Sequence, residues 1–213
     1  MPPAPQNPKV FCVGFQKTGT TSLYFALKTL GLRVTGSVGL DLSAEELAAN
    51  GAALCIETMR DFDAAEDMPW PLYFRELDKA YPGSKFILSV RDADAWHASI
   101  DRHFGDVDTP MHRFVYGADA GRARGAKARW VERMIAHEID VKSHFANRPD
   151  DLLVMDLEAG DDWTPLCAFL GVEIPSQAFP QKNRAADRRK LSYRMKKRVD
   201  LMMGRVPTPE RLL

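Results

Sequence analysis

The sequence is poor in cysteine, with three among 213 residues, and none of its apolar runs approaches the length that crosses a bilayer. Cys12, Cys55 and Cys167 are odd in number, lie far apart and have apolar neighbours, which favours buried, reduced thiols. No two of them have the spacing of metal ligands. These absences argue against a disulfide framework and a membrane span, and they predict a cytoplasmic protein.

An excess of charge of either sign is also missing. Lys plus Arg and Asp plus Glu number 29 each, so no overall field attracts nucleic acid or anionic lipid. The first residues, Met-Pro-Pro-Ala-Pro-Gln-Asn-Pro, lack the basic and apolar segments of a signal peptide, and we expect none. The composition therefore predicts a globular chain with neither nucleic acid nor a membrane as a partner.

Strand and helix patterns alternate along the chain, and its length suits one domain, residues 1–213. Strands are expected at 10–15, 32–35, 52–56, 85–90 and 152–157. Helices are expected at 21–30, after Ser43 in a capping box, and at 70–81, 92–104, 122–146, 163–170 and 185–203. This order predicts a three-layer α/β/α fold with a central parallel sheet and a helical C-terminal part. Ligands bind at the carboxyl ends of such strands, which directs attention to the loops after Phe15, Ile56, Val90 and Leu157.

The first of these loops has the glycine spacing of a P-loop. Gly14 and Gly19 bracket four residues between a buried strand and a helix, so backbone N–H groups and the helix N-terminus would face an anion. A nucleotide-hydrolysing P-loop places lysine at the position of Thr20, whereas this chain carries Lys17 inside the loop. Hydroxyl donors surround this lysine, at Thr18, Thr20, Thr21 and Ser22.

A second anion site is expected after the strand 85–90. Arg91 ends that strand, and Ser99 follows eight residues later on the next helix. A guanidinium and a hydroxyl at this spacing suit a phosphate. The alternative is that Arg91 pairs with Asp92 or Asp94 on the surface.

The two sites together resemble those of the sulfotransferases that use 3′-phosphoadenosine 5′-phosphosulfate (PAPS). Their 5′-phosphosulfate loop has the form Lys-(Ser/Thr)-Gly-Thr-Thr, which matches Lys17-Thr-Gly-Thr-Thr21, and their 3′-phosphate motif is an arginine with a serine eight residues on. The segments Val90–Ser99 and Leu152–Asn183 are similar to a short branch of this family. The resemblance covers most of the chain and implies a P-loop NTPase-like fold.

The resemblance also implies an activity and a set of roles. Lys17 would stabilise charge on the leaving oxygen of PAPS, and the product would be 3′-phosphoadenosine 5′-phosphate (PAP), without a metal ion. The acceptor would be the hydroxyl or amine of a small molecule or a glycan. Lys182 and Arg184 would close over the 3′ phosphate, as basic C-terminal loops do in the family. The basic run Arg188 to Lys190 is better interpreted as a solvated helix face.

The base that takes the acceptor proton is histidine in many relatives and a carboxylate in others. The corresponding segment here, 61–69, has no histidine, and Asp67 before Met-Pro is the first candidate. Glu57, at the end of the strand expected at 52–56, comes second, and His97 and His103 lie on the helix that carries Ser99. Asp67 would need a raised pKa to act near neutral pH.

Two alternatives stay open on the sequence alone. A P-loop kinase or NTPase is one, since Leu152–Asp156 imitates the strand whose final aspartate holds Mg²⁺, with Glu57 as a further possible ligand. Against it, position 20 lacks the P-loop lysine. The other is a non-catalytic protein that keeps the PAPS and PAP site.

Overall fold

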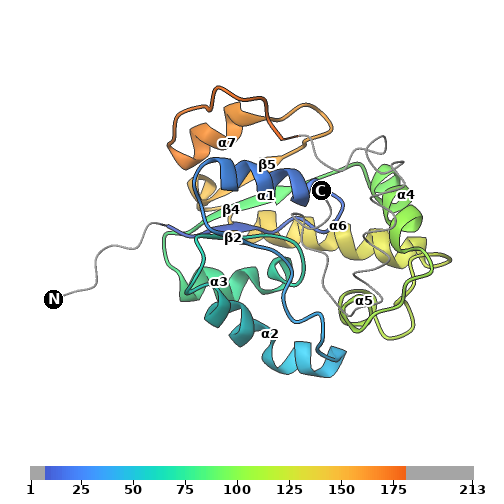
Figure 1. The fold of residues 1–213 in the computed structure, drawn as a ribbon. Helices are drawn as coiled ribbons and strands as arrows, with labels where there is room; N and C mark the ends of the chain where they lie inside the picture. Colours follow the sequence, from blue (N-terminus) through green and yellow to red (C-terminus); the bar gives the residue numbers. More distant parts are fainter. Residues whose placement is uncertain (1–7, 181–213) are drawn as a thin grey trace, which may run out of the picture.

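The structure is a computed structural model that describes residues 8–180. Its centre is a sheet of five parallel strands in the order β2-β3-β1-β4-β5 (Figure 1). The strands are β1 (Val10–Cys12), β2 (Val34–Thr35), β3 (Ala64–Ala65), β4 (Lys85–Ser89) and β5 (Leu152–Met155). Val10 pairs with Ala64 on one side and Lys85 on the other, so β1 is central and its loop lies between two neighbouring loops.

Helices connect the strands and cover both faces of the sheet. They are α1 (Thr20–Thr29), α2 (Ala44–Thr58), η1 (Trp70–Tyr73), α3 (Phe74–Ala80), α4 (Ala93–Phe104), α5 (Pro110–Tyr116), α6 (Lys127–His144), η2 (Pro149–Asp151) and α7 (Trp163–Leu170). Within the part of the chain that the structure describes, no helix is long and apolar enough to span a membrane.

The alternation of side chains along the strands builds two cores. Cys12 and Ile87 face α1 and α7, where they pack with Leu23 and Leu166. The residues just before them, Phe11 and Phe86, face the opposite side, toward α2, α3 and α6. Figure 1 shows α1 and α7 above the sheet and α2 and α3 below it. The predicted three-layer α/β/α fold is confirmed.

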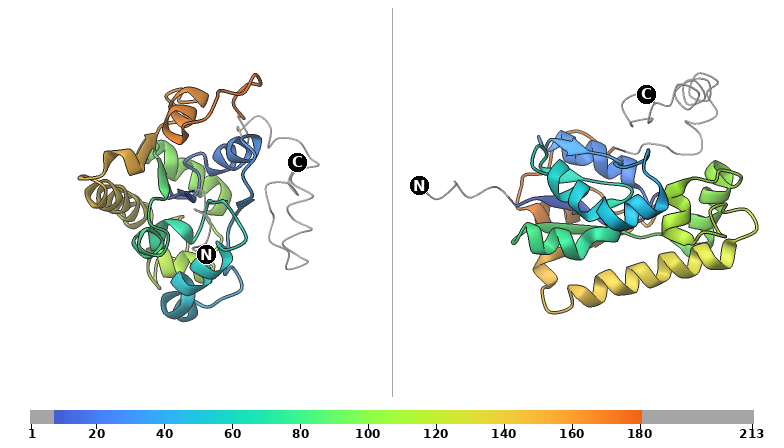
Figure 2. Two further views of the ribbon diagram at one scale, coloured as in Figure 1. Left: turned by 90° about the vertical axis from the view of Figure 1, so that its left-hand side faces the viewer. Right: turned by 90° about the horizontal axis from the view of Figure 1, so that it is seen from below.

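A third core lies beyond the carboxyl ends of the strands. Trp96 of α4, Tyr116 of α5 and Trp130 of α6 are buried together in it. The rings of Tyr116 and Trp130 are stacked, with centroids 3.5 Å apart. Helices α4 and α5 lie at one end of the molecule, beside the edge at which the strands end, and α6 runs from there back along the sheet (Figure 2). We call α4, α5 and the start of α6 the helical group.

The strand expected at 52–56 is wrong, because these residues belong to α2. The predicted capping box is present: Ser43 caps the N–H of Glu46, and the Glu46 carboxylate accepts from the Ser43 N–H. The helix then continues through Gly51, whose missing side chain makes room for the hydroxyl of Tyr73. The alanine-rich sequence on either side of Gly51 favours a helix. The contact with Tyr73 explains why a glycine occurs within α2 although the helix does not end there.

Other boundaries differ in smaller ways. The helix expected at 70–81 begins as the 3₁₀ turn η1, and the long helix expected at 122–146 starts only at Lys127. Helix α5 has no counterpart among the expected helices. The C-terminal helix expected at 185–203 lies outside the described residues.

Candidate functional site

The loop after β1 makes its turn against the end of β4. A side chain at Gly14 would place its Cβ 2.1 Å from the Ser89 hydroxyl and 2.4 Å from the Ser89 carbonyl oxygen. At Gly19, φ is +111°, and a Cβ would meet Leu157 at 2.4 Å. Both glycines are therefore required by contacts within the protein, at the spacing that motivated the P-loop interpretation.

Thr18 supports this loop from inside. It is buried, its hydroxyl lies 2.6 Å from the Ser89 hydroxyl, and it donates to the Phe15 carbonyl at 2.6 Å. Its backbone N–H also points to the Phe15 carbonyl, at 3.3 Å. Thr18 was predicted to donate its hydroxyl to an anion. The structure turns that hydroxyl inward, so we expect it to hold the loop closed.

The other predicted donors lie at the start of α1. Gly19 precedes the helix, and Thr20, Thr21 and Ser22 form its first turn. The positive end of the helix dipole favours an anion beside such a first turn, although the Ser22 N–H already donates to the Gly19 carbonyl at 2.9 Å. Lys17, just before them, has φ of +72°, a conformation that is strained for a residue with a side chain.

The end of β3 brings two consecutive carboxyl groups beside this loop. Glu66 is 2% exposed and hydrogen-bonds to Thr20, while Asp67 is partly buried. Asp67 has φ of +69°. Lys17 and Asp67 are the two residues other than glycine with positive φ in the described part of the chain. Strained backbone of this kind is typical of functional sites.

The surroundings of Asp67 suit a base. Its Oδ1 accepts from the Met68 N–H at 2.9 Å, and the Ser37 hydroxyl also hydrogen-bonds to it. Burial raises the pKa of Asp67 above its ordinary value, an effect that these bonds and the Lys17 charge partly offset. The structure therefore brings Lys17 and Asp67 to the same place, and the pKa of Asp67 moves in the direction that a base requires.

Arg91 lies at the same edge, on the far side of the loop. Its Nη1 donates to the Lys17 carbonyl at 3.0 Å, and its Nη2 pairs with Glu158 at 2.5 Å. Asp92 instead caps α4, and Asp94 pairs with Lys127, so the surface pairing considered for Arg91 is wrong. Ser99 is buried on α4, and among the described residues no hydrogen bond joins its hydroxyl to Arg91. Its role in binding a phosphate stays a prediction.

The remaining candidate bases lie elsewhere. Glu57 is on α2 with a side chain 66% exposed and pairs with Arg60, so its placement at a strand end is wrong. His97 contacts the Ala123 carbonyl inside the helical group. His103 binds the Ser99 carbonyl at 2.7 Å. Lys182 and Arg184 lie outside the described residues.

The chain matches the family described as "Sulfotransferase domain" over residues 9–122 and 111–188. This chain belongs to the sulfotransferase family. It is also 25% identical over 211 residues to Ava biosynthesis cluster protein M of Aspergillus versicolor, with 81% of this chain and 79% of that protein covered.

A polar pair that the sequence pattern did not predict joins the helical group to the P-loop. The side-chain amide of Gln16 donates to the Tyr116 hydroxyl at 2.7 Å. The backbone carbonyl of Gln16 accepts from the Trp96 indole N–H at 2.8 Å. The Oε1 atom of Gln16 is buried without a partner among the described residues. Burial raises the pKa of the Tyr116 hydroxyl, and the charge of Asp67 contributes to this rise. Tyr116 sits on a helix that the sequence pattern did not reveal, which is why this contact was not foreseen.

Asp156, which the sequence suggested as a possible magnesium ligand, stabilises the backbone of its own turn. Asp156 accepts from the N–H groups of Glu158 and Ala159 at 3.0 and 3.1 Å, which closes the turn after β5. Among the described residues, no three His, Cys, Asp or Glu side chains form a group that could hold a metal ion.

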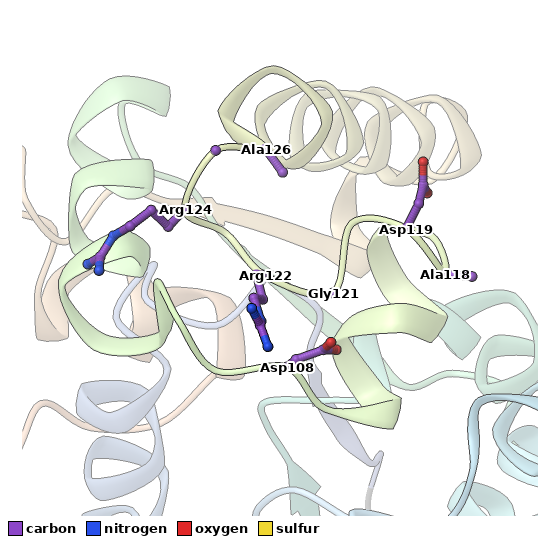
Figure 3. A pocket seen from close by; sticks show the side chains of 8 residues that line it. Asp108, Ala118, Asp119, Gly121, Arg122, Arg124 and Ala126 are labelled. Carbon is purple, nitrogen blue, oxygen red and sulfur yellow. The ribbon is translucent and has the colours of Figure 1, made fainter.

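A hollow of about 400 Å³ opens in the helical group (Figure 3). It is lined by Asp108, Ala118, Asp119, Gly121, Arg122, Arg124, Gly125 and Ala126. Arg122 extends toward Asp108, which is itself paired with Arg113, and Arg124 is paired with Asp101. The P-loop, the carboxyl pair and Arg91 contribute nothing to this lining, so the hollow is distinct from the candidate site.

Proposed function

We propose that this sulfotransferase moves a sulfuryl group from PAPS to a hydroxyl or amine of a small-molecule or glycan acceptor. The observation that carries the proposal is the meeting of Lys17, Asp67 and Arg91 around one P-loop at the carboxyl edge of the sheet. Arg91 supports the fit to a donor with two anionic ends, because its Nε is buried without a partner among the described residues.

PAPS supplies an activated sulfuryl group, and the chain's own residues align and stabilise its transfer. The acceptor oxygen or nitrogen forms a bond to sulfur while the bond from sulfur to the phosphate oxygen breaks. Asp67 takes the proton of the acceptor, and Lys17 stabilises the charge that grows on the departing phosphate oxygen. The first turn of α1 binds the 5′ end, and Arg91 with Ser99 binds the 3′ phosphate.

A titration with three ligands tests the proposal. We expect PAP to bind more tightly than AMP or ATP with Mg²⁺, and a chelator to leave its affinity unchanged. Isothermal titration calorimetry measures all three. A preference for ATP with Mg²⁺ would favour a kinase or NTPase instead. Transfer of labelled sulfate from PAPS to compounds in acceptor extracts then separates an enzyme from a protein that only binds PAP.

Arg91→Ala is expected to weaken PAP binding selectively. Loss of a charge-assisted hydrogen bond costs about 1.5–3 kcal/mol, or roughly 10- to 150-fold in affinity. Because Arg91 also binds the Lys17 carbonyl, any damage to the loop would affect PAP and AMP alike. The ratio of the PAP affinity to the AMP affinity therefore measures the contribution of the 3′ phosphate to binding.

Arg60→Ala, which removes an exposed arginine, is the matched control and should leave that ratio unchanged. Ser99→Ala should lower it less than Arg91→Ala does. If Arg91→Ala still discriminated as the wild type does, the 3′ phosphate would bind elsewhere, with Lys182 and Arg184 as the next candidates.

A further inference from the structure

Glu66 is a buried carboxyl group that the proposed chemistry does not use. It follows Ala64 by two residues, and Ala64 packs in the core that faces α1, so Glu66 points to the same face. There it bonds to Thr20, the first residue of α1. Its Oε2 atom is buried and has no partner in the described part of the chain. An ionised carboxylate with an unpaired oxygen is unfavourable in such a place.

Glu66 and Asp67 differ in what surrounds them. Asp67 has the Met68 N–H, the Ser37 hydroxyl and the charge of Lys17, and all three favour its ionised form. Glu66 has the Thr20 hydroxyl and the negative charge of Asp67. The negative charge of Asp67 raises the pKa of the adjacent, buried Glu66, so the two carboxyl groups do not both ionise readily, and their neighbours place the proton on Glu66 and the charge on Asp67.

The other titratable groups that face the pair agree with this arrangement. From β1, the Cys12 thiol faces Glu66, and burial together with Glu66 raises the pKa of that thiol. On α5, burial raises the pKa of the Tyr116 hydroxyl, and the charge of Asp67 adds a smaller contribution in the same direction. Both groups therefore stay neutral. Burial and Asp67 raise the pKa of Glu66 well above its ordinary value.

We propose that Glu66 is a positioning residue that holds the proton of this carboxyl pair, so that Asp67 alone carries the negative charge and acts as the base. The inference deepens the proposed function and rests on it. The neutral Glu66 carboxyl holds Thr20 at the start of α1, and it spares the anionic donor a second negative charge beside the P-loop.

The free energy of unfolding as a function of pH tests where the proton resides. If folded Glu66 keeps its proton, raising the pH above its ordinary pKa of 4.5 ionises it only in the unfolded chain. Folding then takes up one proton, and the unfolding constant of the wild type rises about tenfold per pH unit relative to Glu66→Gln. Denaturant unfolding between about pH 5 and pH 9 measures this slope.

Glu57→Gln is the matched control, because Glu57 is exposed, and it should track the wild type at every pH. A Glu66→Gln variant whose stability ran parallel to that of the wild type would mean that Glu66 is ionised in the folded protein. That outcome would overturn the inference.

Turnover supplies the second readout. Glutamine has the shape of the protonated carboxyl group and can still bind Thr20, so Glu66→Gln should keep most of the turnover and PAP affinity. Glu66→Ala leaves Thr20 without its partner and should lose turnover that Glu66→Gln retains. A Glu66→Gln variant that binds PAP but does not turn over would show that the proton leaves Glu66 during reaction, which also overturns the inference.

The two proposals fail in different ways. If the wild type sulfated no acceptor in the presence of PAPS, the proposed function would fail, while the stability slope would still decide whether Glu66 holds the proton. If sulfation occurred and the slope were absent, only the role of Glu66 would fail.

Discussion

Lys17→Ala is expected to lower turnover on the order of 10²- to 10³-fold, the usual cost of losing one preorganised group at developing charge. Binding of PAP should change far less, because PAP lacks the sulfuryl group whose departure creates that charge. Lys17 has φ of +72°. Alanine bears the same backbone strain as lysine, so the fold should tolerate the substitution.

The measurement for Lys17→Ala is the pair of turnover rate and PAP affinity. Lys28→Ala is a suitable control, since Lys28 is an exposed lysine at the other end of α1. It should behave as the wild type does. Normal turnover of Lys17→Ala would remove the leaving-group role, and an equal loss of PAP affinity would make Lys17 a binding residue only.

Asp67→Asn is expected to abolish most turnover while PAP still binds. Asparagine keeps the shape of the side chain and tolerates the positive φ at this position, so the change removes basicity and little else. General base catalysis is worth about 10²- to 10⁴-fold, which sets the expected loss.

The role of Asp67 as a base also predicts how turnover changes with pH. A base works in its deprotonated form, so wild-type turnover should rise as the pH passes the raised pKa of Asp67, and Asp67→Asn should lack that rise. Asp61→Asn, in an exposed residue of the same segment, is the control and should keep it. If Asp67→Asn turned over normally, Asp67 would not be the base.

The local order of the candidate site could be predicted from the sequence. Gly14, Gly19 and Lys17 occur at fixed spacing between a buried strand and a helix, and such a pattern has few structural solutions. The capping box at Ser43 and the strand at 85–89 were found for the same reason, because their determinants lie within a few residues of one another.

The errors arose where distant contacts determine the structure. Residues 52–56 are apolar enough for a buried strand, yet they continue a helix because Gly51 accommodates Tyr73 from a neighbouring segment. Strand β3 is two residues long, too short to leave a periodic pattern, and it forms because its neighbours β1 and β2 pair with it. Because the third strand lies at 64–65 and not at 52–56, the expectation that Glu57 ends a strand was also wrong.

The sequence by itself determined the α/β/α class, the P-loop and the family, since these depend on periodicity and on short spacings along the chain. Only the tertiary structure decided which carboxyl groups meet Lys17, which direction Thr18 faces, and that Tyr116 reaches Gln16 from a separate helix. The physical reason is that contacts between residues far apart in the sequence depend on how the helices and strands pack against one another. The protonation state of a buried group depends in turn on the neighbours that this packing places around it.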